Sequence, residues 1–284
     1  MLNVSLGPFA VQVSHLLMLV SMLVAAGIGH LTGKRQQVGI SDVLIEMAWI
    51  ALLAARIVFV AIWFDTYRTA PWSMLDIRDG GFTAWAGLAA AFLVAIWHGW
   101  RRAALRKPLI LGLTAGALAW GGMSGAIGTF GTSGTTGIAN KPLLPTIAVT
   151  TLAGEPTTLA AIGKGQPMVV NLWASWCPPC RREMPVLAAA QQKEKTVTFV
   201  FANQGEDGAT AQRYLSSGRL NMANVLLDSG AALGRAVGST ALPTTLFYDA
   251  SGRLVDTHLG ELSTASLASK LNQLRKRTDL STKE

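Results

Sequence analysis

The apolar residues of this 284-residue chain are concentrated before about residue 130, and the charged and polar residues follow. The first apolar run, residues 9–31, contains no Lys, Arg, Asp or Glu. It is long enough to cross a bilayer, which takes roughly 20 apolar residues in a helix. Three further runs cover about residues 43–64, 81–100 and 109–130. The pattern predicts an α-helical transmembrane domain of about four spans over residues 1–130.

The charges between these runs predict an orientation. Lys34 and Arg35 follow the first run, and the basic stretch RRAALRKP, residues 101–108, follows the third. By the positive-inside rule both loops face the cytoplasm, so the amino terminus and everything after the fourth run face the outside. A cleaved signal peptide is disfavoured because no basic residue precedes the first run.

Residues 131–145, GTSGTTGIANKPLLP, are rich in Gly, Thr and Ser and end in two prolines. This composition is typical of a flexible linker that stiffens where it meets a domain. The remaining residues, 146–284, are enough to bury a single core. The sequence therefore predicts an exported soluble domain after the linker.

The soluble half alternates strand and helix patterns. MVVNLW, residues 168–173, is a continuous apolar run of the kind expected for a central strand buried on both faces. A helical stretch begins near Pro179, and Pro185 is expected to break it. A leading hairpin is expected around Gly154. Further strands are expected at 196–202, 224–228, 244–249 and 254–260, and further helices at about 208–217, 231–236 and 263–277. This order predicts an α/β domain with a mixed sheet.

The composition agrees with a half-membrane, half-soluble chain: 50% of residues are hydrophobic, 14% are charged and the mean hydropathy is +0.37. The formal net charge of +8 raises the question of a nucleic-acid partner. Several basic residues, however, flank the apolar runs, where the positive-inside rule accounts for them. No nucleic-acid partner is expected.

The two cysteines of the chain are Cys177 and Cys180, within NLWASWCPPCRREMP. Thiols three residues apart can close a small disulfide ring. At the end of a strand and the start of a helix, the free N–H groups and the helix dipole stabilise a thiolate on the first cysteine. Cys177 is therefore the expected nucleophile and Cys180 the resolving thiol. Pro179 suits the first helical turn, where a missing N–H costs nothing.

Two cysteines can also serve structural or metal-binding purposes. A structural zinc site normally takes four protein ligands, and His258 is the only histidine of the soluble half, so no metal is expected. A disulfide across three residues constrains little chain entropy. Copper(I) bound by two thiolates stays open, because soft ligands select that ion. Redox exchange is favoured, with no cofactor beyond the redox-active Cys177–Cys180 disulfide.

The cysteine motif together with ALPTTLFYDASGRLVDTHLGEL resembles the TlpA-like, membrane-anchored thioredoxins of bacteria, over about residues 142–277. The resemblance implies a thioredoxin fold with Pro243 as the cis-proline facing the active site. The backbone beside Leu242 would then pair with an extended substrate peptide, and Trp176 would abut the nucleophile. Pro178 and Pro179 would share the substrate-facing surface and tune the reduction potential.

Cytosolic thioredoxins carry a buried aspartate two residues before the first tryptophan of the motif, and this chain has Asn171 there. An asparagine cannot accept a proton, so the deprotonation of Cys180 needs another base. Glu183 stands where this subfamily has an acidic residue, and residues i and i+3 share a helix face. Glu183 is therefore the candidate base. The alternative interpretation is a solvated glutamate favoured by the helix dipole.

A second resemblance covers roughly residues 8–100. AARIVFVAIW followed by DIRDGGFTAWAGL is similar to prolipoprotein diacylglyceryl transferase, in which an arginine-bearing helix precedes a Gly-Gly-x-Ser-x-His-Gly-Gly signature. The positions that match this pattern are Arg56, Gly80, Gly81, Thr83 and Gly87.

Trp85 stands where that family has its essential histidine. Lipid transfer is therefore not expected, and this half is interpreted as a scaffold, an anchor or a partner-binding module. Arg56 lies at membrane depth, where a charge is costly and marks a candidate functional site. It either binds phospholipid or forms a buried structural pair.

The expected function is thiol-disulfide exchange on protein disulfides, by a multi-pass protein of the bacterial inner membrane whose thioredoxin domain faces the periplasm. The membrane half has no cysteine, so a separate membrane thiol reductase must supply electrons if the protein is a reductase. An oxidase or isomerase with the same site is an alternative. A copper(I) chaperone without turnover is another.

Overall fold

The computed structural model describes residues 3–6, 9–34, 39–68, 71–130, 143–239 and 241–281. It contains two compact units. One comprises Met1–Ala10, Leu75–Gly80 and Asn140–Glu284, and the other comprises Val11–Met74 and Gly81–Ala139. Of the expected linker, residues 131–145, the part from 131 to 142 lies outside the described residues.

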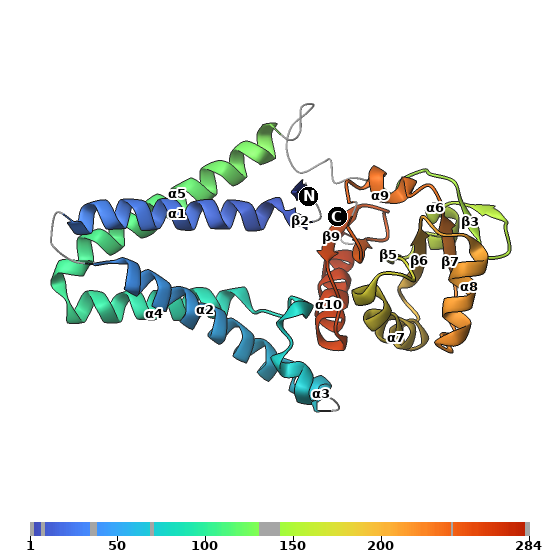
Figure 1. The fold of residues 1–284 in the computed structure, drawn as a ribbon, viewed down its shortest axis with the longest axis horizontal. Helices are drawn as coiled ribbons and strands as arrows, with labels where there is room; N and C mark the ends of the chain where they lie inside the picture. Colours follow the sequence, from blue (N-terminus) through green and yellow to red (C-terminus); the bar gives the residue numbers. More distant parts are fainter. Residues whose placement is uncertain are drawn as a thin grey trace. The chain divides into compact units, whose positions relative to one another are not determined.

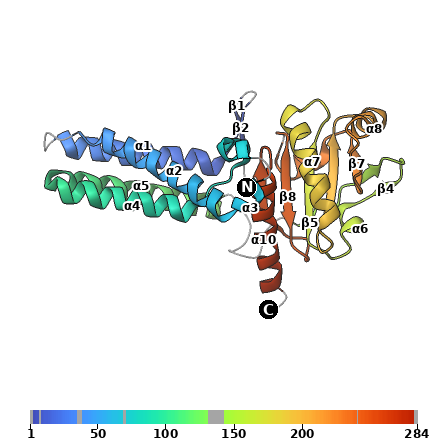
Figure 2. The same ribbon diagram turned by 90° about the horizontal axis from the view of Figure 1, so that it is seen from below.

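The N-terminal part of the chain is almost entirely helical. Its elements are β1 (Asn3–Leu6), β2 (Phe9–Gln12), α1 (Val13–Lys34), α2 (Ser41–Ile62), α3 (Phe64–Tyr67), η1 (Pro71–Leu75), η2 (Ile77–Asp79), α4 (Ala84–Arg101) and α5 (Ala103–Phe130). Within the helical unit α1 packs along α5 and α2 along α4 (Figure 1). Figure 2 shows the four long helices running side by side.

Small residues let these helices approach closely. A Cβ atom on Gly112 would lie 2.8 Å from the carbonyl oxygen of Ala25, and one on Gly87 would lie 2.9 Å from that of Ala51. Such contacts leave room only for glycine, as is common between helices in membranes. Many large apolar side chains on all four helices are exposed, for example Leu23, Leu53, Leu88 and Leu118. Helices that are apolar on their outer faces are suited to contact with membrane lipid.

Three helical segments among the described residues are long and apolar enough to cross a membrane: Leu16–Lys34, Ser41–Ile62 and Ala103–Ala126. The span expected at residues 81–100 forms helix α4, which is outside this set. Its last turn carries His98 and Arg101, which lower its mean hydropathy. The helical membrane domain is confirmed, and the expected count of about four spans is an approximation.

The C-terminal part forms the predicted α/β domain with a mixed sheet. Its elements are β3 (Val149–Thr151), β4 (Pro156–Thr157), α6 (Leu159–Gly163), β5 (Met168–Trp173), α7 (Pro178–Lys193), β6 (Thr198–Gln204), α8 (Gly208–Ser217), β7 (Val225–Asp228), α9 (Ala232–Ala236), β8 (Thr244–Tyr248), β9 (Leu254–Leu259) and α10 (Thr264–Ser281). The strand order is β4-β3-β7-β6-β5-β8-β9. Strands β5, β6 and β7 are parallel, and the other pairs are antiparallel.

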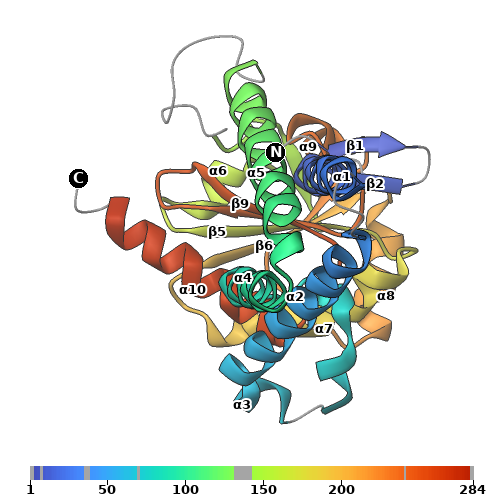
Figure 3. The ribbon, with the colours of Figure 1, turned by 90° about the vertical axis from the view of Figure 1, so that its left-hand side faces the viewer.

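Helices cover both faces of this sheet, with α6 and α9 on one side and α7, α8 and α10 on the other (Figure 3). Side chains of β5 alternate between the two cores. Val169 and Trp173 pack with α7, α8 and α10, whereas Val170 and Leu172 pack with α6 and α9. Because a strand has a period of two, Asn171 faces α7. The fully buried run MVVNLW thus confirms the predicted central strand.

The expected hairpin around Gly154 is confirmed: β3 and β4 pair antiparallel. It is short because Thr158 caps a helix directly after β4. The Thr158 hydroxyl accepts a hydrogen bond from the backbone N–H of Ala161 at 3.2 Å. The break expected at Pro185 is wrong, because α7 continues to Lys193. The proline removes one backbone hydrogen bond, and burial of the helix face bearing Met184 and Leu187 outweighs that loss.

Candidate active site

The two cysteines lie where β5 gives way to α7. Cys177 is the N-cap residue of α7 with extended backbone angles, φ −86° and ψ 109°, and Pro178 and Pro179 occupy the first helical positions. Cys177 and Cys180 form a disulfide with a Cα–Cα distance of 5.3 Å. The Sγ atom of Cys177 also accepts a hydrogen bond from the backbone N–H of Cys180 at 3.3 Å. The sulfur of the N-cap thus takes the place of a capping oxygen at a helix N-terminus.

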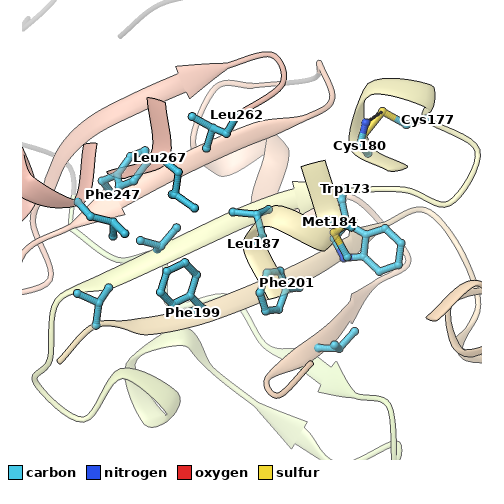
Figure 4. Close-up of a cluster of buried hydrophobic side chains, with 14 of the residues drawn as sticks. Trp173, Cys177, Cys180, Met184, Leu187, Phe199, Phe201, Phe247, Leu262 and Leu267 are labelled. Carbon is cyan, nitrogen blue, oxygen red and sulfur yellow. Dashed lines mark hydrogen bonds between the residues drawn. A yellow bond between two sulfur atoms is a disulfide. The ribbon is translucent and has the colours of Figure 1, made fainter. Parts of the chain in front are cut away.

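The disulfide lies at the edge of the main core, beside Trp173 and Met184 (Figure 4). Cys177 is 3% exposed and Cys180 is completely buried. The two cysteines differ in exposure because Cys177 precedes the helix, whereas Cys180 lies on its buried face. A partner sulfur therefore reaches Cys177 more readily than Cys180.

Trp176 and Leu242 lie beside one groove next to the cysteines. Trp176 is 67% exposed, which is unusual for so large an apolar side chain. The groove has a volume of about 280 Å³ and is lined by Trp176, Gln204, Ala231, Gly234, Arg235, Ser239 and Leu242. The Leu242–Pro243 peptide bond is cis, the geometry that the thioredoxin resemblance implies. The structure thus brings Trp176 and Leu242 together on the surface next to Cys177.

Glu183 lies inside the domain and not at its surface, so its interpretation as a solvated glutamate is wrong. Its Oε1 accepts a hydrogen bond from Nδ2 of Asn171 at 2.7 Å, and its Oε2 accepts one from the backbone N–H of Leu262 at 2.9 Å. Burial raises the pKa of Glu183 to about 8, against the lowering effect of these two donors. A carboxyl group with such a pKa can hold or release a proton near neutral pH.

Asn171 contacts Glu183 directly, which the sequence alone did not indicate. Its Nδ2 also donates to Oγ1 of Thr245 at 3.0 Å. Asn171 and Thr245 lie opposite each other on β5 and β8, which are neighbours in the sheet but far apart in the chain, and Glu183 comes from α7. Asn171 therefore hydrogen-bonds to the candidate base, in addition to standing at the position where cytosolic thioredoxins have a buried aspartate.

Glu206 is a second residue that sequence analysis missed. Its carboxylate accepts hydrogen bonds from the backbone N–H of Ser175 at 2.7 Å, from the Ser175 hydroxyl at 2.5 Å and from Nδ2 of Asn203 at 2.6 Å. Ser175 lies two residues before Cys177. Glu206 thus ties the turn that carries the nucleophile to the end of β6. No local sequence signal marks this contact, because it joins residues 31 positions apart.

Arg56 is buried within the helical unit and bonded to backbone carbonyl groups. Its guanidinium donates to Met74 O at 3.1 Å, Ser73 O at 3.2 Å and Gly81 O at 2.8 Å. A Cβ atom on Gly81 would lie 2.8 Å from Nη1 of Arg56, so glycine is required there. These contacts favour a structural role, in which Arg56 holds the segment after α3 against α2. Trp85, at the position of the family's histidine, is exposed.

The fold and this site define a class of protein. A mixed sheet covered by helices on both faces, a Cys-x-x-Cys disulfide at a helix N-terminus and a cis-proline before β8 are the features of a thioredoxin-fold redox protein. The family profile described as Redoxin matches residues 138–274, and the profile of prolipoprotein diacylglyceryl transferase matches residues 2–202. The chain belongs to the prolipoprotein diacylglyceryl transferase family and carries a thioredoxin-like Redoxin domain fused to it. The two matched ranges overlap at residues 138–202.

Several curated proteins are similar to the C-terminal part. The thiol:disulfide interchange protein DsbE of Pseudomonas fluorescens is 34% identical over 116 residues, which are 41% of this chain and 64% of DsbE. The thiol-disulfide oxidoreductase ResA of Halalkalibacterium halodurans is 32% identical over 114 residues, which are 39% of this chain and 64% of ResA. The alignments thus span somewhat less than two thirds of these relatives.

A solved structure is also similar to this part of the chain. It is a secreted disulfide oxidoreductase of Mycobacterium tuberculosis, with 27% identity and a TM-score of 0.42. The match covers 45% of this chain and 96% of that one.

Proposed function

We propose that the protein is a membrane-tethered thiol-disulfide oxidoreductase that reduces disulfides in other proteins. The observation that carries the proposal is the Cys177–Cys180 disulfide at the start of α7, with a buried carboxyl group one helical turn beyond it. The similarity to DsbE and ResA supports the same class of reaction. No cofactor beyond the cysteine pair is needed, because the pair itself carries two electrons.

In the proposed reaction, the thiolate of Cys177 attacks a substrate disulfide, and one substrate sulfur leaves as a thiolate. A mixed disulfide then joins Cys177 to the other substrate sulfur. Glu183 takes the proton of the Cys180 thiol, and the sulfur of Cys180 attacks the sulfur of Cys177. The Cys177–Cys180 disulfide forms, and the second substrate thiolate leaves. The substrate gains the two electrons that the cysteine pair loses.

The groove beside Trp176 and Leu242 is the proposed binding place for the substrate chain. An extended peptide next to the cis Leu242–Pro243 bond would present its disulfide to Cys177, with Pro178 and Pro179 on the same surface. The exposed indole of Trp176 offers a large apolar contact that is otherwise unfavourable in water.

We further propose that the helices place the protein in the bacterial inner membrane as a multi-pass protein, with the thioredoxin domain in the periplasm. The flanking positive charges support this orientation. The separate membrane thiol reductase remains part of the proposal, because the helical half has no cysteine. A phosphatase fused after Gly134 tests the orientation: activity supports it, and an inactive fusion that is produced at normal levels contradicts it.

For the helical unit we propose an anchoring role without lipid transfer. The packing glycines and Arg56 make contacts within the unit, and an exposed tryptophan replaces the catalytic histidine. Direct phospholipid binding at Arg56 is the rival. An Arg56→Lys chain that still reduces disulfides but loses a co-purified phospholipid would favour the rival.

Two experiments in the native cells test the redox function. A Cys180→Ala chain should accumulate mixed disulfides with substrate proteins at Cys177, and a Cys177→Ala, Cys180→Ala chain should not. Acid-quenched alkylation of the unaltered chain gives the direction: a mostly reduced pair supports reduction, and a mostly oxidised pair supports the oxidase alternative. A Cys180→Ala chain that traps no protein but loses bound copper(I) would instead indicate the copper chaperone.

A further inference from the structure

Asn171 has one amide atom in use and one without a partner. The side chain is completely buried on the central strand β5. Its Nδ2 donates to Oε1 of Glu183 at 2.7 Å and to Oγ1 of Thr245 at 3.0 Å. Its Oδ1 has no hydrogen-bond partner in the part of the chain that the structure describes. Buried acceptors without a partner are rare and costly, so this one calls for an explanation.

The hydrogen bonds that the Glu183 carboxyl group can make depend on whether it is charged or neutral. A charged Glu183 accepts hydrogen bonds at both oxygens, from Asn171 and from Leu262. A neutral Glu183 also has a proton to donate, and its Oε1 faces the amide of Asn171. The missing acceptor for that proton is the Oδ1 atom of this amide.

A half turn of the amide about its last side-chain bond exchanges the positions of Nδ2 and Oδ1. The Oδ1 atom can then accept from the neutral carboxyl of Glu183 and from the hydroxyl of Thr245. A threonine hydroxyl both donates and accepts, so Thr245 fits either orientation. Because the far end of the amide has no partner among the described residues, no third group holds it in one orientation.

We propose that Asn171 is a positioning residue that turns its amide to match the charge of Glu183. In one orientation Nδ2 donates to the carboxylate, and in the other Oδ1 accepts the proton of the carboxylic acid. The inference rests on the proposed exchange reaction and concerns its second step. There the proton of the Cys180 thiol moves to the Glu183 carboxylate while the disulfide with Cys177 forms and the substrate thiolate leaves.

This arrangement lets a buried carboxylate take up a proton without a water molecule. Glu183 is closed to solvent, so its new O–H group must find an acceptor within the protein. An aspartate at position 171 would place a second negative charge at hydrogen-bonding distance from the carboxylate. An asparagine serves both charge states and adds no charge.

The second step can be observed with the full-length reduced protein in detergent. An aromatic disulfide that releases one coloured thiolate at each step gives two phases in a stopped-flow experiment. The first reports attack by Cys177, and the second reports resolution by Cys180. The pH dependence of the second phase is compared among the unaltered chain, Asn171→Leu and Thr245→Val.

Thr198→Val is the matched control. Thr198 lies at the start of β6, opposite Met168, at the other end of β5 from the active site, and its hydroxyl donates to Gln166 at 3.1 Å. The substitution removes a hydroxyl from the same sheet, at a residue that does not contact Glu183.

The pH midpoint of the second phase should rise by about one unit in Asn171→Leu, because the amide's hydrogen bond to the charged carboxylate is stronger than its hydrogen bond to the neutral acid. Thr245→Val should leave the midpoint nearly unchanged, because the Thr245 hydroxyl fits either orientation of the amide and its loss favours neither charge state of Glu183. The first phase and the Thr198→Val profile should not change. An unmoved midpoint in Asn171→Leu would overturn the amide switch. If Asn171→Leu does not fold, the same midpoint is measured in Asn171→Ala, which also lacks the amide.

The failure of the proposed function would look different. An unaltered chain that releases only one coloured thiolate at every pH would show that Cys180 does not resolve the mixed disulfide. Release of two thiolates in two phases, with an unmoved midpoint in Asn171→Leu, would support the exchange reaction and contradict only the role of Asn171.

Discussion

Replacing Glu183 with glutamine should make the thioredoxin domain more stable at alkaline pH. The ordinary pKa of this carboxyl group is 4.5, and burial raises it to about 8 in the folded protein. The folded state therefore binds a proton in the interval between these values and the unfolded state does not. Stability contributed by Glu183 is fully present below about pH 4.5 and is lost as the pH rises through about 8.

The size of this effect follows from the two pKa values. They differ by about 3.5, and one pKa unit corresponds to about 1.36 kcal/mol, so the loss is about 5 kcal/mol. Glutamine has nearly the shape of the neutral carboxyl group and cannot ionise. Its amide can donate to Oδ1 of Asn171 and accept from the N–H of Leu262. The free-energy difference between Glu183→Gln and the unaltered chain should thus grow by several kcal/mol from about pH 5 to about pH 9.

Urea unfolding of the oxidised full-length chain in detergent, read out by brief proteolysis, measures this difference. Comparing two chains at each pH cancels the contributions of all other titrating groups. Glu155→Gln, at an exposed position in the turn before β4, is the matched control and should show a constant difference near zero. A Glu183→Gln difference that is the same at both pH values would refute the raised pKa, whatever its size.

Two further substitutions test other contacts. Glu206→Gln should weaken the link between Ser175 and Asn203, destabilise the domain by about 1–3 kcal/mol and slow the attack by Cys177. Urea unfolding measures the loss of stability, and the first stopped-flow phase measures the attack. An unchanged first phase would show that the turn before Cys177 does not need this carboxylate. Gly81→Ala should destabilise the helical unit by about 1–3 kcal/mol, because its Cβ would lie 2.5 Å from the Phe59 ring. Thermal unfolding in detergent measures that loss, and Gly121→Ala, with open space around it, should be nearly neutral.

Sequence alone placed the strand Met168–Trp173, the start of the helix after Cys177 and three of the four expected membrane-spanning helices. Each of these features depends on a local pattern, namely a continuous apolar run, a Cys-Pro-Pro-Cys at a helix start or a long stretch without charge. Local prediction failed at Pro185. There the packing of a helix face outweighed the propensity of a single residue.

The sequence determined that the chain has a membrane part and a redox pair, because spacing along the chain fixes which thiols meet and which segments fit a bilayer. The tertiary structure decided the environment of that pair. It buried Glu183, placed Asn171 against it and Thr245 against Asn171, and tied Ser175 to Glu206. These contacts join segments up to 74 positions apart. A carboxyl group's pKa depends on solvent access and on neighbours in space, which only the folded sheet and helices set.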